Sequence, residues 1–349
     1  MILVVNAGSS LMKIPLFGLD LTKVIAGQVS GIDGHIAQIS ISSDTKDRSV
    51  PNHETALSTI LAGLATQGIT TDQLIAAAHR VVHGGTALVK PCQMTDNIDA
   101  ETPLAPLHNS KNLAGICALQ TLETILPEYA SFGNAFHAAN QPISTTYAIP
   151  KKDRDISIRR YSFHGLSYVW IVKQFEDRLP DRLFSFNLSY GASLCAIHNS
   201  QSVATTVGYS QLDDLPMNTR SGAIDGMAVL RMAQIHGIDE ASRRLNKDSG
   251  LMGLCGANDI RFLHKSGIKQ AKYNVYHFRY WIARHAGRLI VAMGSLVTLA
   301  FTGGIGQNST DFRNRIMANL KFLGNIPVHM IEADEERQIA LDPITLGVT

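Results

Sequence analysis

The sequence predicts an α/β protein made of two related domains. The main observation is the order of the elements, because a group of short β-strands followed by helices occurs twice along the chain. The length of 349 residues suits two domains with ample hydrophobic core. The composition, 45% hydrophobic and 17% charged, is ordinary for a globular protein. We therefore expect two α/β domains that face a cleft.

The first group of elements consists of strands and then helices. Runs of β-branched and aliphatic residues predict strands at 2–5, 11–17, 24–30, 36–41, 74–82 and 129–136. Asn52 is a typical N-cap residue and predicts the start of a helix at 53–67. Apolar residues at helical spacing between Leu113 and Leu122 predict a second helix at 110–126.

The second group repeats this order. Strands joined by short turns are expected at 183–188, 193–198 and 203–207, and helices at 224–236, 239–247 and 271–293. A strand at 296–302 ends in a glycine turn, and a helix begins at Ser309 or Thr310. The last elements expected are a strand at 328–331 and a short helix at 334–341.

The boundary between the two domains is expected within 140–155. Pro142, Pro150 and the charged run 151–154 interrupt the pattern of elements there. The expected domains are therefore residues 1–148, completed by the C-terminal segment 334–349, and residues 149–333.

Charge and cysteine usage exclude several classes of protein. The net charge is +2 and no five like charges follow one another, so we expect no nucleic-acid partner. No stretch approaches the roughly 18 apolar residues of a membrane helix, and no signal peptide is expected. The four cysteines show no paired or metal-binding spacing, which predicts reduced thiols in a cytoplasmic protein: Cys92, Cys117, Cys195 and Cys255.

The segment from Asn6 to Lys13 predicts an anion-binding hairpin. A strand, a glycine-serine turn and a second strand would present backbone N–H groups, the Ser9 and Ser10 hydroxyls and the Lys13 ammonium. A similar argument applies to Gly303–Gly306, where a glycine-rich turn follows a strand and opens a helix, as in nucleotide-binding loops.

Three further features point to charged partners or ligands. Arg80 lies on an otherwise apolar strand before a glycine turn, and its guanidinium matches either a carboxylate or a phosphate. Taken by itself, Arg80 favours a structural salt bridge. A helix is expected directly after His164, where its N-terminus favours an anion. Glu335 and Glu336 stand at the start of the last helix, where acidic residues favour the helix dipole.

Taken in order, these motifs resemble those of the acetate kinase family. N-A-G-S-S-L-M-K at 6–13 resembles N-A-G-S-S-S-L-K, and R-R-Y-S-F-H-G at 159–165 resembles R-R-Y-G-F-H-G. Further matches are H-R-V-V-H-G-G at 79–85, L-A-P-L-H-N at 104–109, N-D-I-R at 258–261 and T-G-G-I-G-Q-N-S at 302–309. The longest match is L-D-D-L-P-M-N-T-R-S-G-A-I-D at 212–225.

The resemblance covers nearly the whole chain and implies a fold and a reaction. The implied fold is two duplicated ribonuclease H-like (actin-like ATPase) domains facing a central cleft. The implied reaction is reversible in-line transfer of the ATP γ-phosphoryl group to acetate, giving acetyl phosphate and ADP. The implied partners are these substrates and a second copy of the chain, bound through the C-terminal domain, where the helix at 271–293 serves the interface or the core.

The resemblance also implies roles for individual residues. Arg80, His164 and Arg220 would stabilise the charge of the transferring phosphoryl group. Arg80, Val81, Leu107 and His108 would bind the acyl substrate, with Val81 and Leu107 as walls for its methyl group. Asn6 and Glu335 would hold Mg²⁺. The residues implied to contact ATP are Ser9, Ser10, Lys13, Gly191, Asp259, Ile260, Arg261, Gly303, Gly304, Ile305, Gly306 and Asn308.

Several positions depart from the family pattern. Gly133 stands where the family has an aspartate near the metal, and Asn134 beside it is uncharged. Asn187 replaces a phosphate-contacting histidine, and Tyr190 adds a bulky ring to the same loop. Other departures are Leu11 for a serine, Ser162 and Ser189 for glycines, Tyr168 for a common histidine, and Pro343 within the path of the last helix.

These departures leave three readings of the function open. The first is an acetate kinase of reduced activity, because a carboxylate beside the metal is lost. The second is a non-catalytic nucleotide-binding paralogue, which would bind ATP or ADP without turnover. The third is a kinase for another short-chain carboxylate such as propionate or butyrate.

Overall fold

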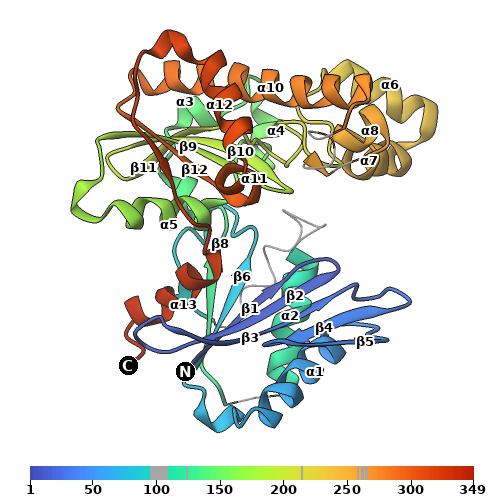
Figure 1. Ribbon diagram of the computed structural model, residues 1–349, viewed down its shortest axis with the longest axis vertical. Helices are drawn as coiled ribbons and strands as arrows, with labels where there is room; N and C mark the ends of the chain where they lie inside the picture. The colour runs from blue at the N-terminus through green and yellow to red at the C-terminus, as the bar shows by residue number, and fades with distance from the viewer. Residues whose placement is uncertain (95–108, 123–124, 214, 258, 261–262, 264–265) are drawn as a thin grey trace. The chain divides into compact units, whose positions relative to one another are not determined.

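The computed structural model describes the chain from Met1 to Thr349 except residues 95–108, 123–124, 214, 258, 261–262 and 264–265. It divides the chain into two compact units (Figure 1). Unit 1 comprises Met1–Ala135 and Asp334–Thr349, and unit 2 comprises Phe136–Ala333. Both termini therefore belong to unit 1.

Unit 2 begins earlier than the boundary at 148 that the sequence indicates. The reason is the packing of Phe136 and His137, whose rings lie against Tyr168 at centroid distances of 6.3 and 5.7 Å. The two prolines near the expected boundary do not mark a linker. They begin or precede short helices within unit 2, α3 (Pro142–Thr145) and α4 (Lys151–Asp155).

Unit 1 contains an eight-stranded mixed sheet in the order β5-β4-β3-β2-β1-β6-β8-β7. Its strands are β1 (Ile2–Ala7), β2 (Leu11–Phe17), β3 (Lys23–Ser30), β4 (Ala37–Ile41), β5 (Asp44–Arg48), β6 (Ala76–Val81), β7 (Cys92–Gln93) and β8 (Glu128–Phe132). Strands β1 to β5 form an antiparallel meander, whereas β6 and β8 run parallel to β1. The expected hairpin at Asn6–Lys13 is the β1–β2 pair.

Helices cover both faces of the unit 1 sheet (Figure 1). Helices α1 (His53–Thr66) and α2 (Asn109–Leu122) pack on the face that carries Leu3 and Val5, whereas α13 (Glu335–Thr345) packs on β1 and β6 from the other face. Asn52 caps α1 as expected, because its Oδ1 accepts a bond of 2.8 Å from the Thr55 N–H. A short 3₁₀ turn lies at Thr71–Gln73, and another, Ala135–Ala139, spans the point where unit 2 begins.

Helix α13 continues beyond its expected end at residue 341. Pro343 lies within its last turn, where a missing N–H costs only one intrahelical bond. The buried Asp342 carboxylate accepts bonds from Ser131 of β8 at 2.5 Å and from Gln338 at 2.7 Å. These bonds hold the C-terminal helix against the sheet of unit 1.

Unit 2 contains a five-stranded sheet in the order β11-β10-β9-β12-β13. Its strands are β9 (Arg182–Leu188), β10 (Ala192–His198), β11 (Gln201–Thr205), β12 (Thr298–Thr302) and β13 (Val328–Met330). Its longer helices are α5 (Gly165–Phe175), α6 (Gly226–His236), α7 (Ile238–Lys247), α10 (Lys269–Met293) and α12 (Thr310–Asn319). Its shorter helical segments are α8 (Gly250–Cys255), α11 (Gly303–Asn308), Glu176–Arg178 and Lys321–Leu323.

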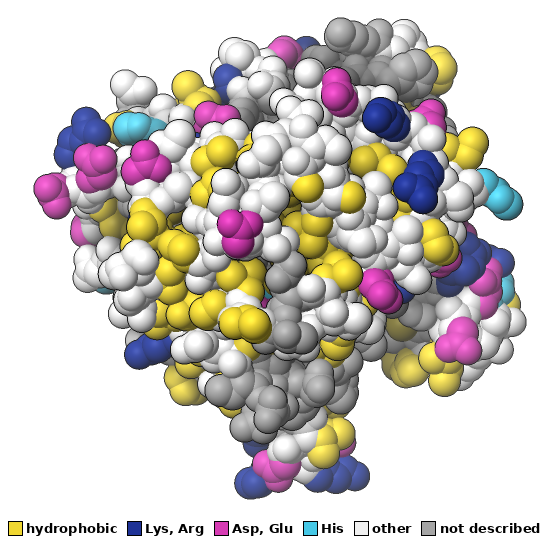
Figure 2. Space-filling model, turned by 90° about the horizontal axis from the view of Figure 1, so that it is seen from below, with side chains coloured by type: hydrophobic (Ala, Val, Ile, Leu, Met, Phe, Trp, Pro, Cys, Tyr) yellow, Lys and Arg dark blue, Asp and Glu magenta, His cyan; other side chains and the backbone are white. Residues whose placement is uncertain are grey.

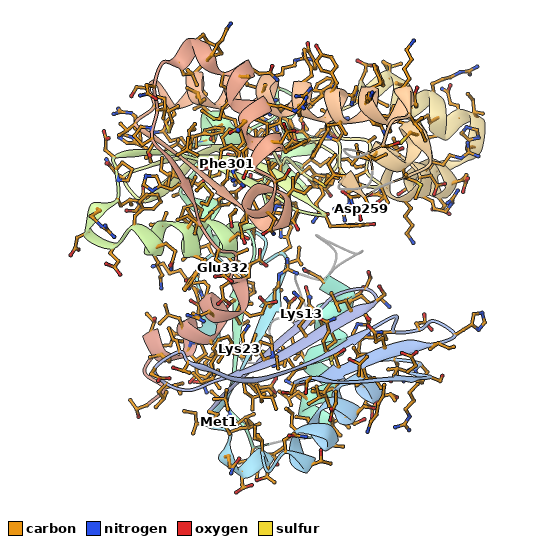
Figure 3. All side chains as sticks on the ribbon, viewed as in Figure 1. Met1, Lys13, Lys23, Asp259, Phe301 and Glu332 are labelled. Carbon is orange, nitrogen blue, oxygen red and sulfur yellow. The ribbon has the colours of Figure 1, made fainter. Side chains whose placement is uncertain are left out.

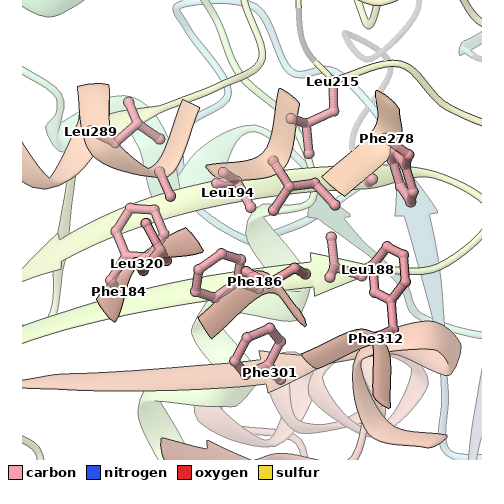
Figure 4. Packing of buried hydrophobic residues seen from close by; sticks show 14 of the residues in the cluster. Phe184, Phe186, Leu188, Leu194, Leu215, Phe278, Leu289, Phe301, Phe312 and Leu320 are labelled. Carbon is pink, nitrogen blue, oxygen red and sulfur yellow. The ribbon is translucent and has the colours of Figure 1, made fainter. Parts of the chain in front are cut away.

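The core of unit 2 lies between its sheet and the helices α10 and α12 (Figure 4). Phe186 of β9 stacks on Phe301 of β12 with ring centroids 4.4 Å apart, and both rings are fully buried. Phe278 of α10 and Phe312 of α12 meet beside them at 5.6 Å. Packed aromatic rings of this size contribute much of the stability of a domain core.

The two sheets share one topology. In unit 1 the order β3-β2-β1-β6-β8 places three antiparallel strands beside two parallel ones, and β11-β10-β9-β12-β13 repeats this in unit 2. This repetition bears out the predicted pair of related α/β domains. Strand β5 is missing from the sequence prediction because its residues, D-T-K-D-R, are all exposed and polar.

Truncating the stacked core ring provides a test of this packing. We expect Phe186→Ala to lower the free energy of unfolding of unit 2 by about 3–5 kcal/mol, because a buried aromatic ring and its contacts are lost. Urea unfolding followed by fluorescence measures the effect. Phe322→Ala is the matched control, because Phe322 is 72% exposed, and its change should stay within about 0.5 kcal/mol. Equal effects of the two substitutions would contradict the account.

Candidate functional site

Unit 1 gathers polar side chains where β1, β2 and β6 meet the start of α13. Asn6 and Lys13 are register partners across β1 and β2 (Lys13 is labelled in Figure 3). Asn6 Nδ2 donates to Glu336 Oε1 at 3.1 Å, and Lys13 Nζ lies 3.4 Å from the same oxygen. Arg80 Nε lies 3.6 Å from Glu335 Oε2. The cluster pairs two cations with two carboxylates.

The pKa of Glu336 reflects this arrangement. Burial alone would raise the pKa of this carboxyl. The Lys13 ammonium and the hydrogen bonds that Glu336 accepts, including those from Asn6 and Lys13, outweigh burial and lower the pKa below its ordinary value. Glu336 is therefore ionised at neutral pH.

Asn6 and Glu335, which are expected to hold the metal together, contact different partners in the structure. Asn6 contacts Glu336, whereas Glu335 faces Arg80. The Asp334 side chain caps α13 by accepting from the Arg337 N–H, and this cap sets which glutamate faces which strand. Because Glu335 and Glu336 are adjacent, the sequence alone could not predict which of them faces Asn6.

Val81, which is expected beside the acyl group, lies on the face of β6 opposite to that of Arg80. Successive residues of a strand point to opposite faces of the sheet. Arg80 therefore faces α13, whereas Val81 is buried on the other face in an apolar cluster with Ile116, Ala130 and Phe132. Leu107 and His108, also expected at the acyl site, lie outside the described residues.

Three buried asparagines hold the loop that follows Arg80. Asn112 Oδ1 accepts from Val82 N–H at 3.0 Å, and its Nδ2 donates to Ala7 O at 2.6 Å. Asn109 bonds both the N–H and the carbonyl of His83, at 3.1 and 2.8 Å. Sequence analysis did not assign these residues. The sequence did contain one clue to Asn112, because it is a polar residue among the apolar residues of the predicted helix at 110–126.

Asn134 is the third of these asparagines, and it does not take the place of the missing aspartate. Its Oδ1 accepts from Gly84 N–H at 2.9 Å, and its Nδ2 donates to Gly85 O at 3.0 Å. Gly133 itself has little space, because a Cβ there would lie 2.9 Å from the Val82 carbonyl oxygen. A carboxylate at position 133 would therefore require a shift of the backbone.

The turn between β1 and β2 matches the expected hairpin. Gly8 N–H donates to Leu11 O at 2.7 Å, and the Ser9 and Ser10 side chains are exposed. His53 Nε2 donates to the Gly8 carbonyl at 2.7 Å and ties the turn to the start of α1. The turn thus offers two hydroxyls beside Lys13.

Unit 2 brings three of its predicted segments together. His164 precedes α5 with φ +60°, and a Cβ at Gly191 would lie 3.5 Å from its Nε2. Gly303 has φ +77°, and a Cβ there would lie 2.6 Å from Leu188 O, so only glycine fits. A Cβ at Gly304 would lie 4.0 Å from Ser189 Oγ. His164, the β9–β10 turn at 189–191 and the glycine loop therefore form one small cradle.

Two substitutions in this cradle occupy different environments. The Tyr190 side chain is 63% exposed and extends into solvent rather than filling the turn. Asn187 is buried, and its Oδ1 would lie 3.0 Å from a Cβ at Gly303. Asn308 holds the same loop from the other side, because its Nδ2 donates to Gly304 O at 2.9 Å.

The remaining predicted residues of unit 2 lie in other segments. Arg220 closes a tight loop in which Met217 N–H donates to Arg220 O at 3.0 Å. The Nη1 atom of Arg220 lies 3.6 Å from Met217 Sδ. Asp259 is labelled in Figure 3, and Ile260 beside it is buried. Ile305 packs against the core of unit 2, next to Gly306. Arg261 lies outside the described residues.

The residues at the unit 1 cluster fit a magnesium ion. Mg²⁺ in proteins takes oxygen ligands and is held by one or two carboxylates together with substrate phosphates. Glu335 and Glu336 supply two adjacent carboxylates, and Asn6 supplies an amide. Within the part of the chain that the structure describes, no group of three or more His, Cys, Asp or Glu side chains forms a complete metal site. The donors therefore suit a metal that arrives with a phosphate.

The surface carries charge of both signs. On the face drawn in Figure 2, Lys and Arg side chains are interspersed with Asp and Glu side chains. Among the described residues, none of the helices combines the length and the apolar character that a membrane crossing requires.

The repeated sheet topology and its close structural matches define the class of the fold, which is the duplicated actin-like ATPase fold. Within that class, the chain belongs to the acetokinase family, whose family model matches residues 1–342. The predicted fold class and family are thereby confirmed.

Relatives named acetate kinase and propionate kinase match almost the whole chain. An acetate kinase of Nitrobacter hamburgensis is 35% identical, and the match covers 99% of this chain and 96% of that relative. The crystal structure of a propionate kinase from Francisella tularensis has a TM-score of 0.93 at 28% identity and covers 98% of both chains. The crystal structure of Porphyromonas gingivalis acetate kinase has a TM-score of 0.90 at 26% identity and covers 99% of both chains.

The lowered pKa of Glu336 predicts a pH dependence of stability. Because the folded-state pKa lies below the ordinary 4.5, ionised Glu336 stabilises the fold above that pH. This stabilisation is lost as the pH falls through the folded-state pKa. We therefore expect the wild type to exceed Glu336→Gln in free energy of unfolding at about pH 6, and the difference to shrink towards about pH 3.

Urea unfolding at a series of pH values measures this difference. Asp47→Asn on β5 is the control, because Asp47 is exposed and its substitution should leave the pH dependence close to that of the wild type. A difference between wild type and Glu336→Gln that stays constant with pH would contradict the assignment.

Proposed function

We propose that this protein is an acetate kinase, which transfers the γ-phosphoryl group of ATP in line to a carboxylate oxygen of acetate. The products are acetyl phosphate and ADP, and the reaction is reversible. The observation that carries the proposal is the unit 1 cluster, where Arg80 and Lys13 stand beside Glu335, Glu336 and Asn6. Anion-binding and cation-binding groups thus lie side by side in a chain of the acetokinase family.

In this proposal the unit 1 cluster exchanges its partners when the substrates bind. Glu335, Glu336 and Asn6 would hold Mg²⁺, which supplies positive charge to the phosphate oxygens when it is bound. Arg80 would then turn its guanidinium to the acetate carboxylate and the transferring phosphoryl group, and Lys13 its ammonium to the nucleotide phosphates. The exposed Ser9 and Ser10 hydroxyls are available as donors to the same phosphates.

His164 and Arg220 of unit 2 are also proposed as donors to the transferring phosphoryl group. Charge on a transferring phosphoryl group is spread over three equatorial oxygens, so donors on several sides stabilise it. The nucleotide would lie along Gly191, Asp259, Ile260 and the glycine loop Gly303–Gly306, with Asn308 supporting that loop.

The loss of the family aspartate lowers the expected activity but does not remove a required base. Acetate is already ionised at neutral pH, so the attacking oxygen has no proton to lose. Gly133 therefore removes charge near the metal rather than a proton acceptor. We propose turnover below that of family members with the aspartate.

Two alternatives to acetate kinase activity predict different results in an acyl phosphate assay. The similarity to a propionate kinase of Francisella tularensis supports propionate as a second acceptor. The substitutions at Gly133 and Asn187 support a non-catalytic nucleotide-binding protein. Acyl phosphate trapped with hydroxylamine, from Mg-ATP with acetate or with propionate, separates these readings. Nucleotide binding without any hydroxamate would favour the non-catalytic protein.

We also propose a homodimer formed through unit 2 and a cytoplasmic location. The support for the dimer is the apolar side chains that α6 and α10 leave exposed: Met227, Leu230, Ile235, Tyr273, Tyr276 and Tyr280. The support for the location is that all four cysteines are free thiols.

Substituting Arg80 tests the proposed reaction. We expect Arg80→Gln to lower kcat/KM for acetate by about 10²–10³-fold, because a charged donor to the transition state is lost. The hydroxamate assay measures this effect. Arg243→Gln is the matched control, because Arg243 lies on the surface of α7 and pairs with Glu240 and Asp248. Activity of Arg80→Gln within twofold of the wild type would contradict the proposal.

A further inference from the structure

A row of three hydrogen-bonded side chains runs from the cradle at His164 and the β9–β10 turn into the core of unit 2. His164 Nδ1 lies 2.8 Å from Ser193 Oγ, and Ser193 Oγ lies 2.6 Å from the Tyr168 hydroxyl oxygen. Ser193 stands on β10, whereas His164 and Tyr168 are one turn apart at the start of α5. Ser193 and Tyr168 are fully buried.

The order of the protons along this row sets which nitrogen of the neutral His164 ring carries its proton. When Tyr168 donates to Ser193, the serine proton is directed to His164 Nδ1, and the neutral ring carries its proton on Nε2. When the ring is protonated, Nδ1–H donates to Ser193 and the serine proton turns to Tyr168. In these two states Nδ1 keeps its hydrogen bond and Nε2 carries a proton, whereas the reverse order of protons would place the proton of the neutral ring on Nδ1.

The Nε2 edge of the ring lies on the side of the cradle. A Cβ at Gly191 would lie 3.5 Å from Nε2 and 3.6 Å from Cε1 of His164. The opposite edge of the ring is therefore held by Ser193, while the Nε2 edge meets the β9–β10 turn. To donate a hydrogen bond to a phosphoryl oxygen at this turn, the His164 ring must carry a proton on Nε2.

The Tyr168 ring cannot easily turn away from Ser193. It stacks on Phe136 with centroids 6.3 Å apart, and His137 packs edge-on against it at 5.7 Å. His137 is itself held by Ser202 at 2.8 Å and by the Phe163 carbonyl at 2.9 Å. Burial lowers the pKa of His137 to about 4, so no charge develops beside Tyr168 at neutral pH.

We propose that Tyr168 is a positioning residue for phosphoryl transfer: through Ser193 it holds the His164 imidazole with its Nε2 proton directed to the turn at 189–191. This inference rests on the proposed function. Tyr168 does not touch the substrates. Its hydroxyl acts on the orientation and the tautomer of the histidine that does.

The test is the tautomer of His164 in Tyr168→Phe, read from ¹⁵N chemical shifts of histidine-labelled protein without substrates. In the wild type we expect Nδ1 to have the shift of an unprotonated nitrogen and Nε2 that of a protonated one. In Tyr168→Phe the two shifts should move towards each other, because Ser193 loses the donor that fixes its hydroxyl. Ser193→Ala should have the same effect and serves if Tyr168→Phe does not fold.

Kinetics give a second readout. We expect Tyr168→Phe to lower kcat by about 10- to 100-fold, as substitutions of groups that orient a site ligand do, with KM for ATP and acetate within about twofold. Tyr161→Phe is the matched control. Tyr161 is also buried and its hydroxyl donates to Ser157 O at 2.9 Å, so it loses a similar bond away from Ser193.

The two readouts separate the inference from the proposed function. If Tyr168→Phe leaves both the ¹⁵N shifts of His164 and kcat unchanged, the positioning role is overturned. A shift that Tyr161→Phe produces equally would overturn it too. If the shifts move as expected but the wild type forms no acyl phosphate, the proposed function fails and the control of the His164 tautomer by Tyr168 is upheld.

Discussion

The arrangement of unit 1 depends on the Asn112 side-chain amide, which joins the ends of β1 and β6. It accepts from Val82 N–H and donates to Ala7 O, so two strand ends from distant parts of the sequence are held in one place. A buried backbone group without a partner costs about 1–3 kcal/mol. Loss of the Asn112 amide would leave two such groups, the Val82 N–H and the Ala7 carbonyl, without this partner. Asn6 and Arg80 stand on these two strand ends, and the geometry of the cluster follows from them.

The second requirement is charge balance, and the C-terminal segment supplies it. Lys13 on β2 and Arg80 on β6 stand on the two strands that flank β1, where two unpaired cations would repel each other. The start of α13 places Glu335 and Glu336 against them, and the Asp342–Ser131 bond anchors the other end of that helix. The same carboxylates that neutralise the cations are the donors that a magnesium ion would use. In the proposed mechanism, substrate binding would exchange partners within this balanced cluster.

Much of the fold could be predicted from the sequence because apolar patterns and turn residues are local. The duplicated order of strands, the hairpin at Asn6–Lys13 and the Asn52 cap all follow from neighbouring residues. Long-range contacts could not be predicted in this way. The Asn112 amide, the choice of Glu336 rather than Glu335 as the partner of Asn6, and the burial of Val81 away from Arg80 each depend on the packing of distant segments. The polar strand β5 forms only because β4 pairs with it.

The central claim is that acetate oxygen attacks the γ-phosphorus of ATP. The most direct measurement is ³¹P NMR of the reaction of Mg-ATP with acetate labelled with ¹⁸O in its carboxylate. In-line transfer forms a bond from a carboxylate oxygen to phosphorus and breaks the bond to the ADP oxygen. The account predicts acetyl phosphate whose phosphorus signal shows the isotope shift of one ¹⁸O. Unlabelled phosphate as the only product, or bound ATP with no turnover, would contradict it.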